Sequence, residues 1–505
     1  MTLRPRHGLL AAGFVVLAAT LLWLVAGAFV AAKDRTREYR YLSEALDPLF
    51  EPASTVSWLP PERPLTRSLS PTDEALIGRA LTQAWRAFTA AQDTGETMLL
   101  AEHFSGTAYD RARIASAQAA ADGSRMVVLD QTAHPRFHHL DGSIFQLSAS
   151  ATTLRYRLSE EAILQFQLSR DEVTTTLTNE TTGWRIFSHE RHASTPVTPA
   201  KREPLILPRL MGINYYPAQT PWSRFWPEFD PSVIAADLDL VTSLNANALR
   251  IFLPPADFAD DPAGADNLRK LNDFLRMAED RDLSVIPTLF DMKSTYRPAH
   301  WAEDVAYLRR VLPVLDASPA VVLVDLKNEP DLDHGTAGKP LVDAWLITMI
   351  QMTRDIAPAL PLTIGWATAE AAPDHAPLLD AISYHDYAPA EGTADRLARV
   401  REGARGKPVL VTEIGVSSYT LALRFPGSPA SQAGELADRM TALGPADGVF
   451  IWTLHDFPAP EARAVGGSPW VRNLQSRFGL YDATGAAKPA AAAVAAAFAD
   501  ATRPD

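Results

Sequence analysis

The sequence contains no cysteine among its 505 residues. Disulfide bridges, thiolate metal sites and a cysteine nucleophile are therefore excluded. The compartment stays open, because a disulfide-free protein can occupy either side of a membrane. Positive charge is also in deficit: 47 Lys and Arg face 60 Asp and Glu, a formal net charge of −13. Because an acidic chain repels phosphate backbones, nucleic acid is not expected as a partner.

Charge is absent from one long segment near the N-terminus, Leu9–Ala32. At a rise of about 1.5 Å per residue, this segment can span the roughly 30 Å hydrocarbon core of a bilayer. A cleaved signal peptide is the alternative, with Arg4 and Arg6 as its charged region. The apolar part of such a peptide normally covers only about 7–15 residues. We therefore expect a transmembrane signal anchor at 9–32, with the lipid bilayer as a partner.

The next part of the chain changes from a linker to a folded region. Residues 33–69 are rich in proline and show no sustained period, which predicts a juxtamembrane linker. The capping signal at Ser70–Asp73 predicts a helix, a second helix is expected at about 108–121, and alternating apolar and polar residues then predict strands. This order predicts an α+β domain at 70–193, whose pattern resembles the NTF2-like domains. Residues 194–207 form a second linker, and we expect the parts on either side of it to fold separately.

From residue 208 onward, strand and helix patterns alternate. The strand candidates are Leu210–Tyr216, Ala248–Leu253, Ser284–Phe290, Val321–Asn328, Leu362–Trp366, Ala381–Tyr387, Val409–Glu413 and Gly448–His455. Eight such units predict an α/β domain at 208–500 with the fold of a (β/α)8 TIM barrel. A doubly wound open sheet is the competing fold, but no glycine-rich phosphate loop follows the first strand.

Polar residues gather at the ends of these predicted strands, where barrel enzymes carry their catalytic groups. Asn328 and Glu329 end the fourth strand, and Glu413 ends the seventh. The second strand carries Arg250, the sixth carries His385 and Tyr387, and the eighth carries Trp452. Any one of these residues alone would more often have a structural role, so the constellation as a whole carries the argument.

This constellation resembles glycoside hydrolase clan A, and most closely its cellulase-like family 5. The resemblance covers about 208–500 and implies that Glu329 is the acid/base and Glu413 the nucleophile. It further implies that Arg250, Asn328, His385, Tyr387 and Trp452 bind or support the substrate.

The chemistry needs two carboxyl groups on either side of one glycosidic bond, and Glu329 and Glu413 lie 84 residues apart, room for three strand–helix units. A retaining enzyme places such groups about 5–5.5 Å apart. We expect Glu413 to be ionised, with Arg250 favouring its charge and Tyr387 donating a hydrogen bond. Glu329 should start protonated, its pKa raised by burial and by the charge of Glu413. Asn328 should bind the 2-hydroxyl of the sugar.

Aromatic side chains suit the apolar faces of sugar rings. Among the aromatic residues of the barrel, we expect Trp366 and Trp452 to line sugar subsites. Within the predicted barrel, the sequence has neither a His-x-x-x-His nor a Glu-x-x-His pattern, so it predicts neither a metal nor a cofactor.

Together, these observations predict a membrane-anchored retaining glycoside hydrolase that cleaves a β-linked glycan or exopolysaccharide. A transglycosylase on the same fold and a non-catalytic scaffold in an envelope-polysaccharide assembly are the alternatives, and that assembly is a candidate partner. Charges flank the apolar segment on both sides, so they leave its orientation open. Because the expected substrate lies outside the cell, we expect a single-pass protein with its catalytic domain on the periplasmic or extracellular side.

Overall fold

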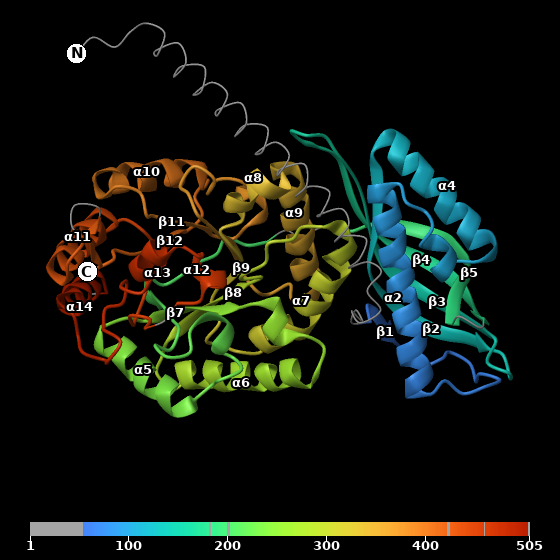
Figure 1. Cartoon of the computed structure of the whole chain (residues 1–505), viewed down its shortest axis with the longest axis horizontal. Helices are drawn as coiled ribbons and strands as arrows, with labels where there is room; N and C mark the ends of the chain where they lie inside the picture. Colours follow the sequence, from blue (N-terminus) through green and yellow to red (C-terminus); the bar gives the residue numbers. More distant parts are fainter. Residues whose placement is uncertain (1–53, 181–182, 199–201, 422–424, 459, 503–505) are drawn as a thin grey trace, which may run out of the picture.

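The computed structural model describes residues 54–502, apart from 181–182, 199–201, 422–424 and 459. The chain forms a small α+β part followed by a larger β/α part (Figure 1). The membrane anchor expected at Leu9–Ala32 lies outside the described residues, as does most of the linker expected at 33–69. Within the described residues, no helix is both long enough and apolar enough to cross a membrane.

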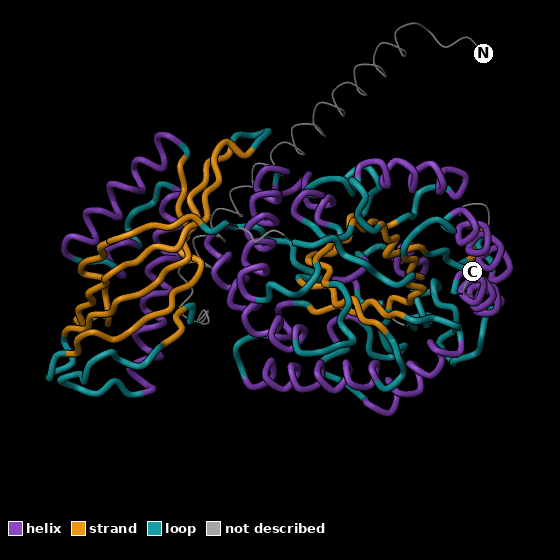
Figure 2. The backbone as a smooth tube through the Cα atoms, turned by 180° about the vertical axis from the view of Figure 1, so that it is seen from behind, coloured by secondary structure: helices purple, strands orange, loops and turns teal. Residues whose placement is uncertain are grey.

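The small part is a five-stranded sheet with helices on one face (Figure 2). Its strands are β1 (Val56–Trp58), β2 (Ser124–His138), β3 (Ile144–Leu158), β4 (Ile163–Glu180) and β5 (Gly183–Pro196), and its helices are α2 (Pro71–Thr94), α3 (Leu100–His103) and α4 (Gly106–Asp122). β1 falls within the expected linker and pairs in parallel with β2. The helices precede the long antiparallel strands, as the sequence predicts, while the resemblance to NTF2-like domains stays a prediction.

The sequence places α2 through its cap and its apolar stripe. The Ser70 hydroxyl accepts a hydrogen bond from the Asp73 backbone, and the Asp73 carboxylate accepts one from the Ser70 backbone, which satisfies amides that have no helical partner. Ile77, Leu81 and Phe88 then recur on one face and are buried against the sheet. Gly95 ends the helix with a φ of 74°, a conformation that glycine adopts without strain.

The larger part is a closed barrel of parallel strands in chain order, which confirms the predicted (β/α)8 fold. Its strands are β6 (Leu210–Asn214), β7 (Ala248–Leu253), β8 (Ser284–Leu289), β9 (Val324–Asn328), β10 (Leu362–Trp366), β11 (Ile382–His385), β12 (Val409–Ile414) and β15 (Gly448–Ile451). The helices are α5 (Pro231–Ser243), α6 (Pro262–Glu279), α7 (Trp301–Asp316), α8 (His334–Ala337), α9 (Lys339–Ile356), α10 (Thr393–Gly403), α11 (Pro429–Ala442), α12 (Ala462–Val465), α13 (Pro469–Gln475) and α14 (Pro489–Ala501). A short pair, β13 (Thr420–Leu421) and β14 (Phe425–Pro426), follows β12.

The strands are buried on both faces, which explains why their sequences are apolar runs without alternation. At the N-terminal end of the barrel, Leu210, Ile286 and Phe450 belong to one buried layer. Gly212 leaves space for the Phe450 ring, because a Cβ at this position would lie 2.2 Å from it. The N-terminal half of the barrel is therefore filled with apolar side chains, and the polar groups are left at the opposite end.

The second face of the small sheet packs against the barrel, with α7 and α9 lying between the two parts (Figures 1 and 2). Leu129 and Leu154 of the sheet belong to the same buried apolar cluster as the barrel residues. The Tyr156 ring stacks on Trp301 with 5.5 Å between centroids, and Arg309 Nε donates to Asp130 at 2.9 Å. The two parts therefore share one apolar cluster, which argues against the expectation that they fold separately.

Candidate active site

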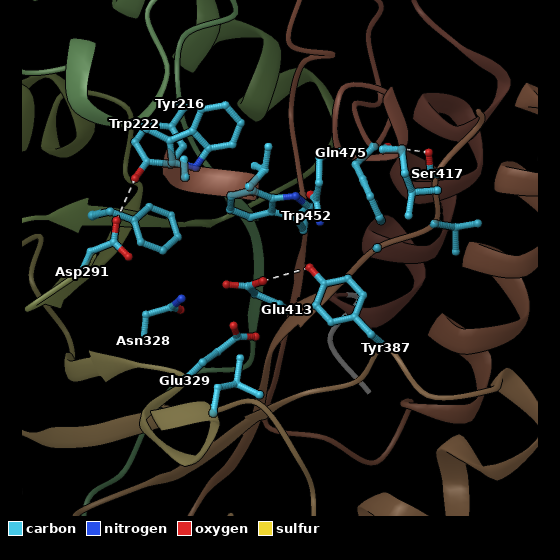
Figure 3. A pocket seen from close by; sticks show the side chains of 18 of the residues that line it. Tyr216, Trp222, Asp291, Asn328, Glu329, Tyr387, Glu413, Ser417, Trp452 and Gln475 are labelled. Atoms are coloured by element: carbon cyan, nitrogen blue, oxygen red, sulfur yellow. Dashed lines mark hydrogen bonds between the residues drawn. The ribbon is translucent and has the colours of Figure 1, made fainter. Parts of the chain in front are cut away.

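The C-terminal ends of the barrel strands surround a cavity of about 1080 Å³. Six of the side chains that the sequence singled out gather there: Arg250 of β7, Asn328 and Glu329 at the end of β9, His385 and Tyr387 at the end of β11, and Glu413 of β12. Figure 3 shows four of them, Asn328, Glu329, Tyr387 and Glu413. Trp452, which follows β15, lies on the wall of the same cavity (Figure 3). The barrel thus brings together residues from five strands.

Glu413 is buried and held at both carboxylate oxygens. Arg250 Nη1 donates to Oε1 at 2.5 Å, and the Tyr387 hydroxyl donates to Oε2 at 2.8 Å. Charge-assisted hydrogen bonds of this kind are shorter and stronger than neutral ones. The arrangement fixes both carboxylate oxygens of Glu413 at the cavity wall, as a nucleophile requires.

Arg250 organises this wall from behind. Its guanidinium is fully buried and donates to Asp325 Oδ2 through Nη2 at 2.7 Å and Nε at 3.1 Å. It also donates to Asn214 Oδ1 at 3.0 Å and to Asn328 Oδ1 at 2.8 Å. Although burial alone would lower the pKa of Arg250, the charges of Asp325 and Glu413 raise it. Arg250 is therefore a permanent cation that joins β6, β9 and β12.

Glu329 leaves the barrel wall in an uncommon backbone conformation. Its φ and ψ are 48° and 50°, in the left-handed region that non-glycine residues rarely adopt. Its amide donates to Gly365 O at 2.7 Å, and its Oε1 lies 2.8 Å from His385 Nδ1. One carboxylate oxygen of Glu329 and one of Glu413 lie within 4.8 Å of each other. Such backbone conformations are concentrated at functional sites, where the surrounding structure holds them.

The pKa of Glu329 corrects one expectation from the sequence. Burial raises this pKa, as expected, but the hydrogen bond from His385 and the positive charges of His385, Arg250 and Lys327 outweigh burial and lower it. The sequence argument counted the charge of Glu413 and overlooked these cations. In the free protein, Glu329 therefore favours the carboxylate form.

Of the two tryptophans expected to line sugar subsites, Trp452 lies on the cavity wall and Trp366 does not. Trp452 lies edge-on to Phe252 and Tyr216 on the cavity wall, and its bond to Thr453 is a cis peptide. Trp366 is fully buried, stacks against His375 at 6.1 Å and does not line the cavity. The prediction of a sugar platform at Trp366 is wrong because side chains alternate along a strand. Gly365 faces the cavity network, so Trp366 points to the other face of β10.

Several residues that line the cavity were not predicted as site residues. They include Tyr216 and Trp222 from the loop after β6, Asp291 and Lys293 from the loop after β8, Lys327 of β9, and Ser417, Gln475 and Phe478 from the loops after β12 and β15. Asp325 and Asn214, which support Arg250 from within the barrel, were not predicted either. The available signal was a charged residue inside an apolar strand, since Asp325 stands between Val324 and Leu326.

Glu329, His385 and Glu413 also offer donor atoms close enough together to hold a metal ion. The electrostatics of the wall oppose this use, because the Arg250 guanidinium is already bound to Glu413 at 2.5 Å. A cation coordinated by Glu413 would lie beside that permanent positive charge. The arrangement therefore suits acid–base chemistry by carboxylates better than metal binding.

A scan against protein-family models and a search of curated proteins each found no match. Among solved structures, the chain is similar to an exo-β-1,4-mannosidase from Opitutaceae bacterium strain TAV5, with 22% identity, a TM-score of 0.48, and 59% of this chain and 61% of that chain covered. It is also similar to a GH5_18 protein from Streptomyces cattleya in complex with GlcNAc, with 21% identity, a TM-score of 0.49, and coverage of 60% and 82%. A GH2 β-galacturonidase from Eisenbergiella tayi has 16% identity, a TM-score of 0.46, and coverage of 73% and 71%. The solved structures similar to this chain thus include glycoside hydrolases.

Proposed function

We propose that the protein is a retaining glycoside hydrolase, with Glu413 as nucleophile and Glu329 as acid/base. The observation that carries the proposal is the pair of carboxylates facing one cavity, with oxygens within 4.8 Å of each other. Retaining enzymes need carboxyl groups about 5–5.5 Å apart, whereas inverting enzymes need about 6.5–9.5 Å to admit a water molecule. The short separation therefore favours direct attack by Glu413 on the sugar.

In the first step, Glu413 attacks the anomeric carbon while Glu329 donates a proton to the departing oxygen. Arg250 and Tyr387 hold the Glu413 carboxylate in place, so little reorganisation is needed as the new bond forms. Because Glu329 favours its ionised form in the free protein, a bound sugar must raise the pKa of Glu329 before this carboxyl group can donate a proton. The sugar can do so by weakening the His385 contact or by displacing water from around the carboxylate. Donation by Glu329 then yields a covalent glycosyl-enzyme and a free leaving group.

In the second step, Glu329 accepts a proton from water, and the resulting hydroxide attacks the intermediate and frees Glu413. Asn328 assists both steps by binding the 2-hydroxyl of the sugar. Its Oδ1 already accepts a hydrogen bond from Arg250, so its amide NH₂ group is the part left to donate. A β-linked polysaccharide or oligosaccharide is the substrate class, and the aromatic side chain of Trp452 on the cavity wall is the apolar surface for its rings.

Substitution of each glutamate separates the two roles. Glu413→Ala should abolish turnover, with azide restoring part of it and giving a product of inverted configuration. Glu329→Ala should be milder on aryl glycosides with activated leaving groups, and azide should there give a retained glycosyl azide. General acid/base help is worth about 10²–10⁴ in rate, and we expect a larger loss without the nucleophile.

The stereochemistry of the products can be read by NMR, and Glu402→Ala on the exposed face of α10 serves as the control. Near wild-type turnover by both alanine variants at Glu329 and Glu413 would refute the assignment. Inverted product from the wild type would replace the retaining mechanism with an inverting one.

We also propose that Leu9–Ala32 anchors the protein in the cell membrane, with the catalytic domain on the periplasmic or extracellular side. Support comes from the length of the uncharged segment and from the location of polymeric glycans. An alkaline phosphatase reporter fused after residue 505 should be active only if the C-terminus is exported. A reporter active solely in the cytoplasm would contradict this orientation.

A further inference from the structure

Lys327 is a lysine buried in the wall of the active-site cavity, two residues before Glu329. It is 4% exposed and lines the cavity from β9. A buried ammonium group is costly unless it is paired or hydrogen-bonded. Its Nζ donates to the backbone oxygen of Asn328 at 2.6 Å and lies 3.9 Å from Asp333 Oδ2.

The Asn328–Glu329 peptide is consequently held at both of its polar atoms. Lys327 Nζ binds the oxygen, while the Glu329 N–H donates to Gly365 O on the neighbouring strand β10 at 2.7 Å. This is the peptide at which the chain turns into the left-handed conformation of Glu329, with a φ of 48°. A residue that precedes proline is pushed toward extended conformations, so Glu329, followed by Pro330, needs outside support to stay in this one.

The charges around Lys327 fit a structural hydrogen bond better than a recognition site for anions. Asp291 after β8 and Asp333 after β9 face it, and Lys293 lies near it but is paired with Asp304 at 2.9 Å. Burial lowers the pKa of Lys327, whereas the carboxylates of Asp333, Asp291 and Glu329 act to raise it. An anionic sugar at this position would face those same carboxylates.

We propose that Lys327 is a positioning residue that clamps the Asn328–Glu329 peptide and so directs the acid/base carboxylate. The clamp keeps Glu329 Oε1 within 2.8 Å of His385 and turned toward Glu413. Its role in turnover rests on the proposed function. Loss of the clamp impairs protonation of the leaving group. It does not impair attack by Glu413, because Arg250 and Tyr387 hold that carboxylate from other strands.

Leaving-group dependence separates this role from a general loss of structure. Lys327→Met keeps the length of the side chain and removes its donors. We expect it to lower kcat about 10- to 100-fold on aryl glycosides with poor leaving groups, part of the 10²–10⁴ that general acid catalysis supplies. With dinitrophenyl glycosides, whose departure needs little protonation, kcat should fall less than about threefold. Lys327→Gln retains an N–H donor without charge and should recover part of the loss.

Lys488→Met is the matched control, because it removes a buried ammonium that lies outside the active-site cavity and has no contact to the Asn328–Glu329 peptide. Its kcat ratio between good and poor leaving groups should equal the wild-type ratio. An equal fall on all substrates in Lys327→Met, or an unchanged kcat on poor leaving groups, would overturn the proposal.

A second measurement tests the clamp without turnover. In Lys327→Met, the Glu329 amide should exchange with deuterium faster than in the wild type, since its hydrogen bond to Gly365 O loses the support of the clamped peptide. Equal exchange would refute the clamp whatever the activity. If the amide exchanges faster but the wild type hydrolyses no glycoside, the clamp stands as a structural feature and the proposed function fails.

Discussion

Arg250 donates hydrogen bonds to four side chains in and around the proposed active site. It binds Glu413 directly, and it binds the amides of Asn214 and Asn328 and the carboxylate of Asp325. Lysine could not replace it, because a single ammonium cannot reach partners on three sides in a plane. The residue thus couples the stability of the barrel to the orientation of the nucleophile.

Arg250→Met should destabilise the protein by about 3–5 kcal/mol, because Asp325 and Glu413 would remain as buried charges without their partner. Denaturation by urea measures the loss of unfolding free energy. Arg269→Met, which breaks an exposed pair with Asp266, should change it by less than about 1 kcal/mol. A similar small change in both variants would contradict the role of Arg250.

His385→Ala should move the basic limb of the pH profile of kcat/KM to higher pH. The reason is that burial raises the pKa of Glu329, while the hydrogen bond and charge of His385 lower it, so their removal raises it. A general acid must be protonated, and activity is lost as pH rises through its pKa, so a raised pKa shifts that loss upward. His192→Ala on β5 should leave the limb in place, and a shift to lower pH in His385→Ala would refute the assignment.

At the scale of elements, β10 carries glycine at position 365, where the absence of a side chain leaves space for the groups of neighbouring strands. A Cβ on Gly365 would lie 2.7 Å from Asp325 Oδ2 and 2.9 Å from Arg250 Nη2. The strand therefore has to carry glycine at this position for the buried ion pairs to form.

Gly365→Ala should cost about 1–3 kcal/mol of unfolding free energy through overpacking and should reduce turnover by displacing Arg250. Gly434→Ala in α11 is the matched control, since nothing lies within 4 Å of the added Cβ. That variant should gain up to about 1 kcal/mol from higher helix propensity. Thermal denaturation measures both, and equal effects would show that the Asp325–Arg250 contact does not restrict position 365.

The sequence predicts elements well where their pattern is local. β7 and β10 have the expected bounds. The sequence pattern does not predict a strand or a side-chain orientation that a long-range contact determines. Three residues of β1 become a strand only because β2 lies beside them, and the orientation of Trp366 depends on the strand register around the barrel.

The same distinction applies to the site. Glu329 and Glu413 could be found because each stands at the end of a recognisable strand, and Arg250 because it is a charged residue inside one. The roles of Asp325 and Lys327 could not be predicted, because these roles come from the partners that the closed barrel brings to them. The expected rise in the pKa of Glu329 was wrong for the same reason, since His385 approaches Glu329 from a different strand.

At the scale of the whole molecule, the small sheet is a structural part of the barrel surface. A fragment of residues 202–505 should melt at a lower temperature than residues 54–505, because it exposes Trp301 and the apolar cluster beneath the sheet. The longer protein should show one unfolding transition by calorimetry.

Proteolysis between Pro196 and Glu203 tests the same interface. The two pieces should stay together in gel filtration, held by the shared core and by the Arg309–Asp130 pair. Tyr156→Ala, which removes the ring stacked on Trp301, should allow them to separate. Two independent transitions or immediate separation of the wild-type pieces would contradict a shared core.

The position of the interface has a mechanical consequence. α7 and α9, on which the sheet lies, precede and follow β9 in the chain, and β9 ends at Asn328, next to the proposed acid/base Glu329. If the N-terminus is tethered to a membrane and the barrel binds a polymer, tension between the two is carried by the covalent chain that joins the two parts and by this interface, where it acts on α7 and α9. Because β9 lies between these two helices in the chain, tension at the interface would reach the proposed acid/base Glu329 through its own strand.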